Sequence, residues 1–304
     1  MMGIKSPFFS VVIPTYNRVH KILECVKSVL DQTFRDYEIV IIDNGSTDGT
    51  EEIIKNNIID KRLRYFWQIG SGSPANSRNQ GIINSKGEWV SFLDSDDIWH
   101  PEKLKCCYEH IQNNPSVDVI CHHERLVSPR SNSKEKILRH GRKTKDMYKS
   151  LLMEGNCFSP SATSIKRQFL INNNLFFKES DHFAIVEDYD LWLRIAKKGA
   201  QFFSFNKCLG DYIVDDENLI GDWERYISNI ENLLRYHAYH LQDFEPDHEK
   251  LFSKLQTRLH FDKLKRAFKE KDFKCAAFEL NSILRKYPAF LPKKIFQKAI
   301  STVG

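Results

Sequence analysis

The chain has 304 residues, enough to bury a sizeable core in one large domain, or in a domain of roughly 200 to 250 residues with an appendage. Hydrophobic residues make up 41% and charged residues 28%, which excludes the disordered and collagen-like classes. The formal net charge is +5, yet residues 251–304 carry 13 lysines and arginines against 4 aspartates and glutamates, so the remainder is net acidic.

Cysteine usage and hydropathy bear on the compartment. The seven cysteines form no C-x-x-C pair and no regular spacing, which favours a reducing environment. No run of about 18 apolar residues occurs, and residues 1–9 lack the apolar stretch of a secretory signal. We therefore expect a cytoplasmic protein without a membrane-spanning helix.

Strand-like and helix-like segments alternate through the first hundred residues. Apolar runs predict strands at 8–13, 37–42, 63–67 and 88–93. Helix-like segments follow at 22–30, at 51–57 and from 74. This alternation predicts a mostly parallel sheet that is covered on both faces. In such sheets ligands bind beyond the carboxyl ends of the strands, so the loops after Ile13, Ile42 and Leu93 should face one crevice.

The pattern changes in the rest of the chain. Residues 128–144 are polar, basic and weakly patterned, which predicts a mobile loop. Beyond residue 222 helical patterns dominate, with segments at 223–240, 250–269, 273–285 and 293–302. The sequence therefore predicts a sheet domain over 1–220 and a helical, basic extension over 221–304.

An acidic turn, Asp94-Ser95-Asp96-Asp97, follows the apolar strand at 88–93. Three carboxylates within four residues repel one another unless a positive charge lies between them. Mg²⁺ and Mn²⁺ prefer oxygen ligands and commonly take one or two carboxylates together with phosphate oxygens. The turn alone is equally compatible with a solvated loop whose acids cap the next helix.

Four further sites have polar or aromatic side chains suited to ligand binding. Asp43 ends a strand and can accept hydrogen bonds from a nucleobase or ribose, or cap a turn. Arg78 can bind phosphate oxygens through two nitrogens, or lie exposed on its helix. Glu187 and Asp188 begin a helix whose dipole favours an ionised carboxylate, as a general base requires, although capping explains Asp188 equally well. Trp99 can stack on a sugar ring or pack in the core.

Five segments in order along the chain carry a recognisable pattern. They are SVVIPTYNR at 10–18, IDNGSTDGT at 42–50, SRNQG at 77–81, FLDSDD at 92–97 and EDYDLWLR at 187–194. Together they resemble family 2 glycosyltransferases of the bacterial surface-polysaccharide type, which have the GT-A fold. The resemblance covers about residues 8–218. It implies an α/β fold, with a Rossmann-like, mostly parallel sheet flanked by helices, followed here by an all-helical C-terminal extension.

The resemblance implies an inverting transfer of a hexose or N-acetylhexosamine from a UDP-sugar to an acceptor hydroxyl, with Mn²⁺ or Mg²⁺ as cofactor. By matching the family's motifs, the donor nucleotide would be bound by Pro14, Thr15, Tyr16, Arg18, Asp43, Arg78, Asp94 and Ser95. Asp94 and Asp96 match the D-x-D motif, with Asp96 the direct metal ligand, and Asp188 matches the catalytic base. Trp99 and Glu187 would face the sugar or the acceptor.

The sequence departs from the family's pattern at two positions. Asn44 replaces a second aspartate that often follows the same strand, so Asp43 is the only carboxylate there. Asp215 stands where many relatives have a histidine near the metal or the diphosphate. An aspartate can supply a further oxygen ligand at that place, or the contact can be missing.

The partners follow from the same resemblance and from the basic tail. The acceptor would be a lipid-linked glycan in the synthesis of O-antigen, lipopolysaccharide, capsule or another surface polysaccharide. Apolar residues spaced among lysines in the tail indicate peripheral contact with the cytoplasmic face of the inner membrane. No nucleic-acid partner is predicted.

Two alternatives stay open. A sugar nucleotidyltransferase also uses an acidic metal site on an α/β sheet, but it typically begins with a glycine-rich, basic loop that residues 13–17 lack. A non-catalytic module for nucleotide sugars or glycans is the other alternative, and the presence of Asp188 argues against it.

Overall fold

A computed structural model describes residues 6–70, 72–128, 136–214 and 222–286. These residues form two compact units, one within 1–151 and 155–222 and the other within 152–154 and 223–304. The predicted division into domains 1–220 and 221–304 stays a prediction about independently folding parts.

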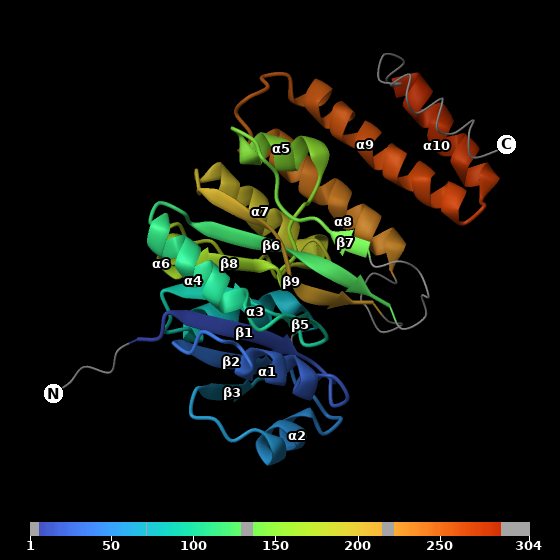
Figure 1. The fold of residues 1–304 in the computed structure, drawn as a ribbon. Helices are drawn as coiled ribbons and strands as arrows, with labels where there is room; N and C mark the ends of the chain where they lie inside the picture. The colour runs from blue at the N-terminus through green and yellow to red at the C-terminus, as the bar shows by residue number, and fades with distance from the viewer. Residues whose placement is uncertain (1–5, 71, 129–135, 215–221, 287–304) are drawn as a thin grey trace. The chain divides into compact units, whose positions relative to one another are not determined.

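The first unit is built on a mixed sheet with the strand order β3-β2-β1-β4-β8-β6-β9-β5, and β7 pairs with β6 (Figure 1). The strands are β1 (Phe9–Thr15), β2 (Tyr37–Asp43), β3 (Leu63–Trp67), β4 (Trp89–Phe92), β5 (Ile98–Trp99), β6 (Val119–Val127), β7 (Lys136–Leu138), β8 (Thr163–Lys166) and β9 (Phe202–Ile213). The helices up to residue 222 are α1 (Ile22–Leu30), α2 (Thr50–Asn57), α3 (Pro74–Asn84), α4 (Lys103–Asn113), α5 (Met147–Glu154), α6 (Arg167–Asn172), η1 (Asp181–Phe183) and α7 (Glu187–Lys197).

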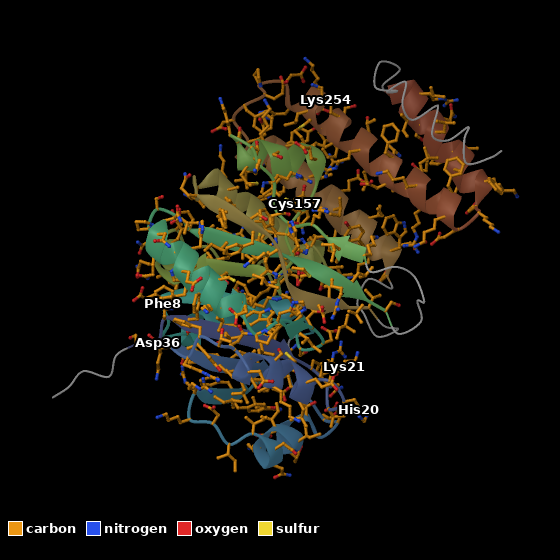
Figure 2. All side chains as sticks on the ribbon, viewed as in Figure 1. Phe8, His20, Lys21, Asp36, Cys157 and Lys254 are labelled. Atoms are coloured by element: carbon orange, nitrogen blue, oxygen red, sulfur yellow. The ribbon has the colours of Figure 1, made fainter. Side chains whose placement is uncertain are left out.

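The N-terminal half of the sheet is parallel, with β1 between β2 and β4 and with β3 outside β2. β1 and β2 are buried along their whole length, as expected for strands with helices on both faces. Phe8 and Asp36 lie side by side at the amino ends of β1 and β2, whereas His20 and Lys21 lie beyond the opposite end of β1 (Figure 2). The loops beyond the carboxyl ends therefore gather at one edge of the sheet.

The remaining pairings are mostly antiparallel. β8 pairs antiparallel with β4 and β6, β7 with β6 and β5 with β9, while β6 and β9 run parallel. The predicted α/β fold with flanking helices and a helical C-terminal region is confirmed, and its sheet is mixed beyond β4. The loop predicted at 128–144 contains β7, while residues 129–135 lie outside the described part.

Helices cover both faces of the parallel strands. Val11 and Ile13 of β1 share a core cluster with residues of α1 and α4. Val12 points to the other face, where α3 approaches so closely that a Cβ on Gly81 would lie 2.1 Å from Cγ1 of Val12. Glycine at this position therefore allows α3 to pack closely against the sheet. The same helix carries Arg78.

The second unit is helical within its described residues. It contains α8 (Trp223–Tyr236), η3 (His237–Leu241), α9 (His248–Lys269) and α10 (Phe273–Lys286). α9 and α10 pack through Leu264, Ala267, Ala276 and Ile283. These elements match the predicted helical segments, while the segment predicted at 293–302 lies outside the described residues. No helix in the described part is long and apolar enough to cross a membrane.

We expect Gly81→Ala to lower the free energy of unfolding by about 1–3 kcal/mol, because an added methyl group overpacks the contact between α3 and β1. Urea denaturation measures this change. The matched control is Ile83→Ala on the same helix, where the side chain is 53% exposed and the expected change is within about 0.5 kcal/mol. Equal losses in the two variants would contradict the packing argument.

Candidate functional site

A pocket of about 580 Å³ opens beyond the carboxyl ends of β1, β2 and β4, and this volume is typical of small-molecule sites. Eight of the residues predicted to bind the donor or the metal line it: Pro14, Thr15, Tyr16, Arg18, Arg78, Asp94, Ser95 and Asp96. Tyr16 is 55% exposed, so the face of its ring is available to a ligand. The structure thus brings together side chains from β1, α3 and the acidic turn.

The acidic turn is held by its last residue. One carboxylate oxygen of Asp97 accepts a hydrogen bond from the Ser161 hydroxyl at 2.5 Å, and the other accepts one from the backbone N–H of Ile213 at 3.0 Å. Burial, together with the charges of Glu124 and Asp94, raises the pKa of Asp97 well above its usual value. Asp97 is therefore an anchor for the turn.

The other two carboxylates face the pocket. The Asp96 side chain is 18% exposed and forms an ion pair with Arg18, with 3.8 Å between Nη2 of Arg18 and Oδ2 of Asp96. Burial and the charge of Asp94 raise the pKa of Asp96, which shows that negative charge is crowded here. A divalent cation would relieve this repulsion.

The carboxylate ligands of the turn suit Mg²⁺ or Mn²⁺ if phosphate oxygens complete the coordination. No group of three or more His, Cys, Asp or Glu side chains suited to a metal occurs among the described residues. Mg²⁺ and Mn²⁺ sites in nucleotide enzymes commonly use one or two carboxylates with phosphate oxygens, and Asp94 and Asp96 provide that number. Asp215, the other predicted ligand, lies outside the described residues.

Arg78 joins the acidic turn to the start of α7. Its Nη2 lies 2.7 Å from Oδ1 of Asp94, and its Nη1 lies 2.8 Å from Oε1 of Glu187. Burial alone would lower the pKa of Arg78, but the charges of Asp94 and Glu187 raise it above its ordinary value. The side chains of Arg78 and Glu187 are 7% and 6% exposed, so this is a buried charge bridge.

The structure shows Arg78 and Glu187 in contacts that the sequence did not predict. The guanidinium that was expected to bind ribose or diphosphate here binds two carboxylates, although Arg78 still lines the pocket. Nε of Arg78 and Oε2 of Glu187 are buried and have no hydrogen-bond partner among the described residues. Glu187 is held inside the bridge in this structure, and its predicted contact with sugar or acceptor stays a prediction.

Asp188 follows Glu187 at the start of α7. One carboxylate oxygen accepts a hydrogen bond from the Asn156 side chain at 3.2 Å, and the other accepts one from the backbone N–H of Tyr189 at 2.6 Å. Burial and the charge of Glu187 raise the pKa of Asp188 to about 7, and Arg78 opposes this shift. A carboxyl group with a pKa near neutrality is suited to accept a proton at neutral pH.

Two predicted site residues lie in the interior. Both carboxylate oxygens of Asp43 already accept hydrogen bonds, one from the backbone N–H of Ser46 at 2.7 Å and one from the Tyr65 hydroxyl. Trp99 is 2% exposed, and its Nε1 donates to the carbonyl oxygen of Ser161 at 2.7 Å. A sugar contact is therefore not retained for Trp99, whose ring belongs to the core.

The structure adds pocket residues that were not assigned to the donor or the metal from the sequence. These are Asn44, Gly70, Gly72, Ser73, Pro74, Ser77, Asp97, Tyr212 and Ile213. Ser73 is recognisable only as a helix cap, since its hydroxyl accepts a hydrogen bond from the backbone of Ala75. Tyr212 reaches the acidic turn because β9 pairs with β5, which no local pattern reveals.

The family of the chain is shown by comparison with known proteins. The model of the family described as Glycosyl transferase family 2 matches residues 10–173, more than half of the chain. The chain therefore belongs to this family, as predicted.

The relatives agree with this assignment. An uncharacterized glycosyltransferase of Rickettsia conorii is 36% identical over 199 residues, which are 63% of this chain and 30% of the relative. Glycosyltransferase GlyG of Streptococcus pneumoniae is 37% identical over 116 residues, 38% of each chain. The chain thus spans less than a third of the length of the first of these relatives.

Solved structures share the fold. S. aureus TarS 1-349 in complex with UDP-GlcNAc superimposes with a TM-score of 0.66 at 20% identity, covering 92% of this chain and 81% of that one. A mannosyltransferase from Pyrobaculum calidifontis, in complex with GDP-Man and Mn²⁺, gives a TM-score of 0.62 at 16% identity and covers 99% of this chain and 81% of its own.

We expect Arg78→Met to lower the free energy of unfolding by about 3–5 kcal/mol, because it leaves the buried carboxylate of Glu187 and the partly buried one of Asp94 without their cation. The control is Lys55→Met, which removes an exposed ion pair with Glu51 and should cost about 0–1 kcal/mol. Chemical denaturation of both variants measures the difference. A loss for Arg78→Met as small as that of the control would show that the bridge contributes little.

Proposed function

We propose that this chain is an inverting glycosyltransferase that moves a hexose or N-acetylhexosamine from a UDP-sugar to an acceptor hydroxyl. The observation that carries the proposal is the Arg78 bridge, which ties the acidic turn of the pocket to Glu187, the neighbour of Asp188. Proteins of the same fold in complex with UDP-GlcNAc, and with GDP-Man and Mn²⁺, support a nucleotide-sugar donor.

The donor would occupy the pocket with its nucleoside near the end of β1. The exposed ring of Tyr16 can stack on the base, and Arg18 can bind phosphate oxygens. For Asp43, contact with the base requires that it exchange the hydrogen bond from Tyr65 for one from the base. Pro14, Thr15 and Ser95 would shape the wall of the nucleotide site.

Asp96 would hold Mn²⁺ or Mg²⁺, with Asp94 as a second ligand through the oxygen that Arg78 does not occupy. When bound, such a cation supplies positive charge to the diphosphate of the leaving group. The buried anchor at Asp97 keeps the turn in place while the donor enters and leaves. The carboxylates of the turn would in this way hold positive charge where the departing diphosphate gains negative charge.

Asp188 would act as the general base. It accepts the proton of the acceptor hydroxyl while that oxygen attacks the anomeric carbon, and the bond to the diphosphate breaks on the opposite side. A single displacement of this kind inverts the anomeric carbon, and UDP leaves with the electron pair of the broken bond. Asn156 orients the carboxylate through its hydrogen bond at 3.2 Å.

We expect Asp96→Asn and Asp188→Asn to fail in different ways. The first should weaken metal-dependent binding of the donor, while the second should spare donor binding and lower transfer by about 10²- to 10⁴-fold, as loss of a general base does. Metal-dependent UDP release from UDP-glucose, UDP-galactose, UDP-N-acetylglucosamine and UDP-N-acetylgalactosamine measures activity, and calorimetry measures donor binding. Asp31→Asn, at an exposed helix end, is the matched control.

The pH dependence of UDP release tests the role of Asp188. Because Asp188 must be deprotonated and its pKa is raised to about 7, the rate of transfer should increase as the pH rises through about 7 and should be lower at more acidic pH.

Full metal-dependent activity in Asp96→Asn would overturn the assignment of the turn. A binding module would show no turnover even in the unsubstituted chain, and a nucleotidyltransferase would make nucleotide sugars from a nucleoside triphosphate and a sugar phosphate.

The acceptor proposed here is a lipid-linked glycan of surface-polysaccharide synthesis, used at the cytoplasmic face of the inner membrane. In the second unit Phe273 and Phe278 of α10 are each 65% exposed and lie among Lys274 and Arg285. Exposed aromatic rings among cations are typical of helices that lie on anionic lipid surfaces. Ile283, by contrast, is buried between α9 and α10, so it belongs to the helical core.

Replacing both rings, as Phe273→Ser with Phe278→Ser, should lower association with vesicles of phosphatidylglycerol and phosphatidylcholine by at least about tenfold, because two large apolar side chains are lost from the interface. Co-sedimentation measures the bound fraction. The control pair is Ile59→Ser with Ile69→Ser, at side chains that are 99% and 83% exposed in the first unit. Unchanged partitioning of the α10 variant would sink the membrane proposal.

A further inference from the structure

A second hollow, of about 840 Å³, lies in the first unit between residues 139–147 and the amino-terminal part of β9. It shares no lining residue with the donor pocket. Phe203 lines this hollow and Tyr212 lines the donor pocket, and both are on β9. Their partners on β6 are Ile120 and Leu126, six residues apart, so at about 3.3 Å per residue the two positions lie roughly 20 Å apart along the sheet. The hollow is therefore a separate site.

Positive charge dominates its lining. Arg139, Arg142, Lys143 and Lys145 contribute four cations, and Asp146 is the only carboxylate of the lining. That carboxylate is already used, since Oδ1 of Asp146 accepts the backbone N–H of Lys149 at 2.8 Å and caps α5. We call this hollow the basic pocket.

The backbone that carries these cations is fixed. The N–H of His140 donates to Nδ1 of His123 at 3.1 Å, and its carbonyl oxygen accepts the Ser204 hydroxyl at 2.5 Å. The N–H of Gly141 donates to the carbonyl oxygen of Cys157 at 2.8 Å. Gly141 has a φ of +79°, and a Cβ there would lie 2.4 Å from Cβ of Ser204. A site that is already ordered loses less entropy when a ligand binds.

The cations divide into one that builds the pocket and three that face its solvent side. Nη1 of Arg142 donates to the carbonyl oxygens of Ser150 and Gly155, which closes the segment against α5. Arg139, Lys143 and Lys145 are exposed, and no carboxylate in the described ranges pairs with them. Unpaired cations that converge on a hollow attract anions.

The surroundings agree with an electropositive site. Burial lowers the pKa of His123, and the charges of His140 and Arg139 lower it further. His140 itself is bound to Glu124, with 2.8 Å between Nε2 and Oε2, so that carboxylate does not neutralise the pocket's lysines. Phe203 and Phe205 add apolar surface to the lining.

We propose that the basic pocket binds a phosphate-bearing ligand other than the sugar-nucleotide donor, with its phosphate between Arg139, Lys143 and Lys145 and its carbon skeleton against the phenylalanines of β9. Arginine and lysine together are the side chains that bind phosphate oxygens most strongly. The ligand's phosphate comes either from a soluble phosphate-containing glycan or from a lipid headgroup. This proposal stands whether or not the chain transfers sugars.

The test measures binding of inorganic tripolyphosphate to the full chain by calorimetry, with UDP present in excess to fill the donor pocket. Lys143→Glu with Lys145→Glu should weaken binding by at least about tenfold, since two favourable contacts with the anion become repulsive. The matched control is Lys61→Glu with Lys86→Glu, which makes the same charge change at exposed lysines outside both pockets and should weaken binding less than about twofold. Thermal unfolding of both variants verifies that each is folded.

Vesicles distinguish the two sources of phosphate. If phosphatidylglycerol vesicles displace tripolyphosphate from the unsubstituted chain but phosphatidylcholine vesicles do not, the ligand is a headgroup. If neither displaces it, the ligand is soluble. Equal weakening in the two double variants, or no tripolyphosphate binding by the unsubstituted chain, would overturn the proposal.

Discussion

The buried charge bridge from Asp94 through Arg78 to Glu187 is the constraint on which the site depends. It joins three parts of the chain, the turn after β4, helix α3 and the start of α7. Removing one member of a buried pair leaves an uncompensated charge, so the three parts are energetically tied. Gly81 lets α3, the helix that carries Arg78, lie close to β1.

The same bridge explains how two carboxylates of one site differ in chemistry. Asp94 gives one oxygen to Arg78, whereas Asp188, the neighbour of Glu187 in the chain, has an amide and a backbone N–H as partners. Environment thus raises the pKa of Asp188 while the acidic turn presents oxygen ligands to the pocket. The proposed metal ligands and the proposed base are in this way linked through Arg78 and Glu187.

The strands, helices and turns that depend on local sequence pattern could be predicted from the sequence. The buried runs of β1 and β2 and the helical segments of the second unit are set by periodicity, and the acidic turn is placed by the strand before it. The resemblance to family 2 glycosyltransferases, which rests on five motifs in order along the chain, predicted which of these residues form one site. Asp94 and Asp96 accordingly face one pocket with Arg18 and Arg78.

The rest depended on partners far away in the sequence. Nothing near Asp43 indicates that the Tyr65 hydroxyl occupies one of its oxygens, and nothing near Trp99 indicates that its ring N–H donates to the carbonyl oxygen of Ser161. The segment around Gly141 is fixed by hydrogen bonds to β6, β9 and residue 157. Such bonds between distant residues leave no periodic pattern in the sequence, so the polar composition of the segment predicted a mobile loop.

Strand β9 has a consequence for the size of whatever the protein handles. Its carboxyl end contributes to the donor pocket and its amino end to the basic pocket, and its pairing with β6 fixes their separation despite the bulges between Ser204 and Gly210. The two places lie roughly 20 Å apart along the sheet. A molecule that touches both must be extended to that length, so a chain of repeating units would be measured before its end reaches Asp188, and a short one would occupy either place alone.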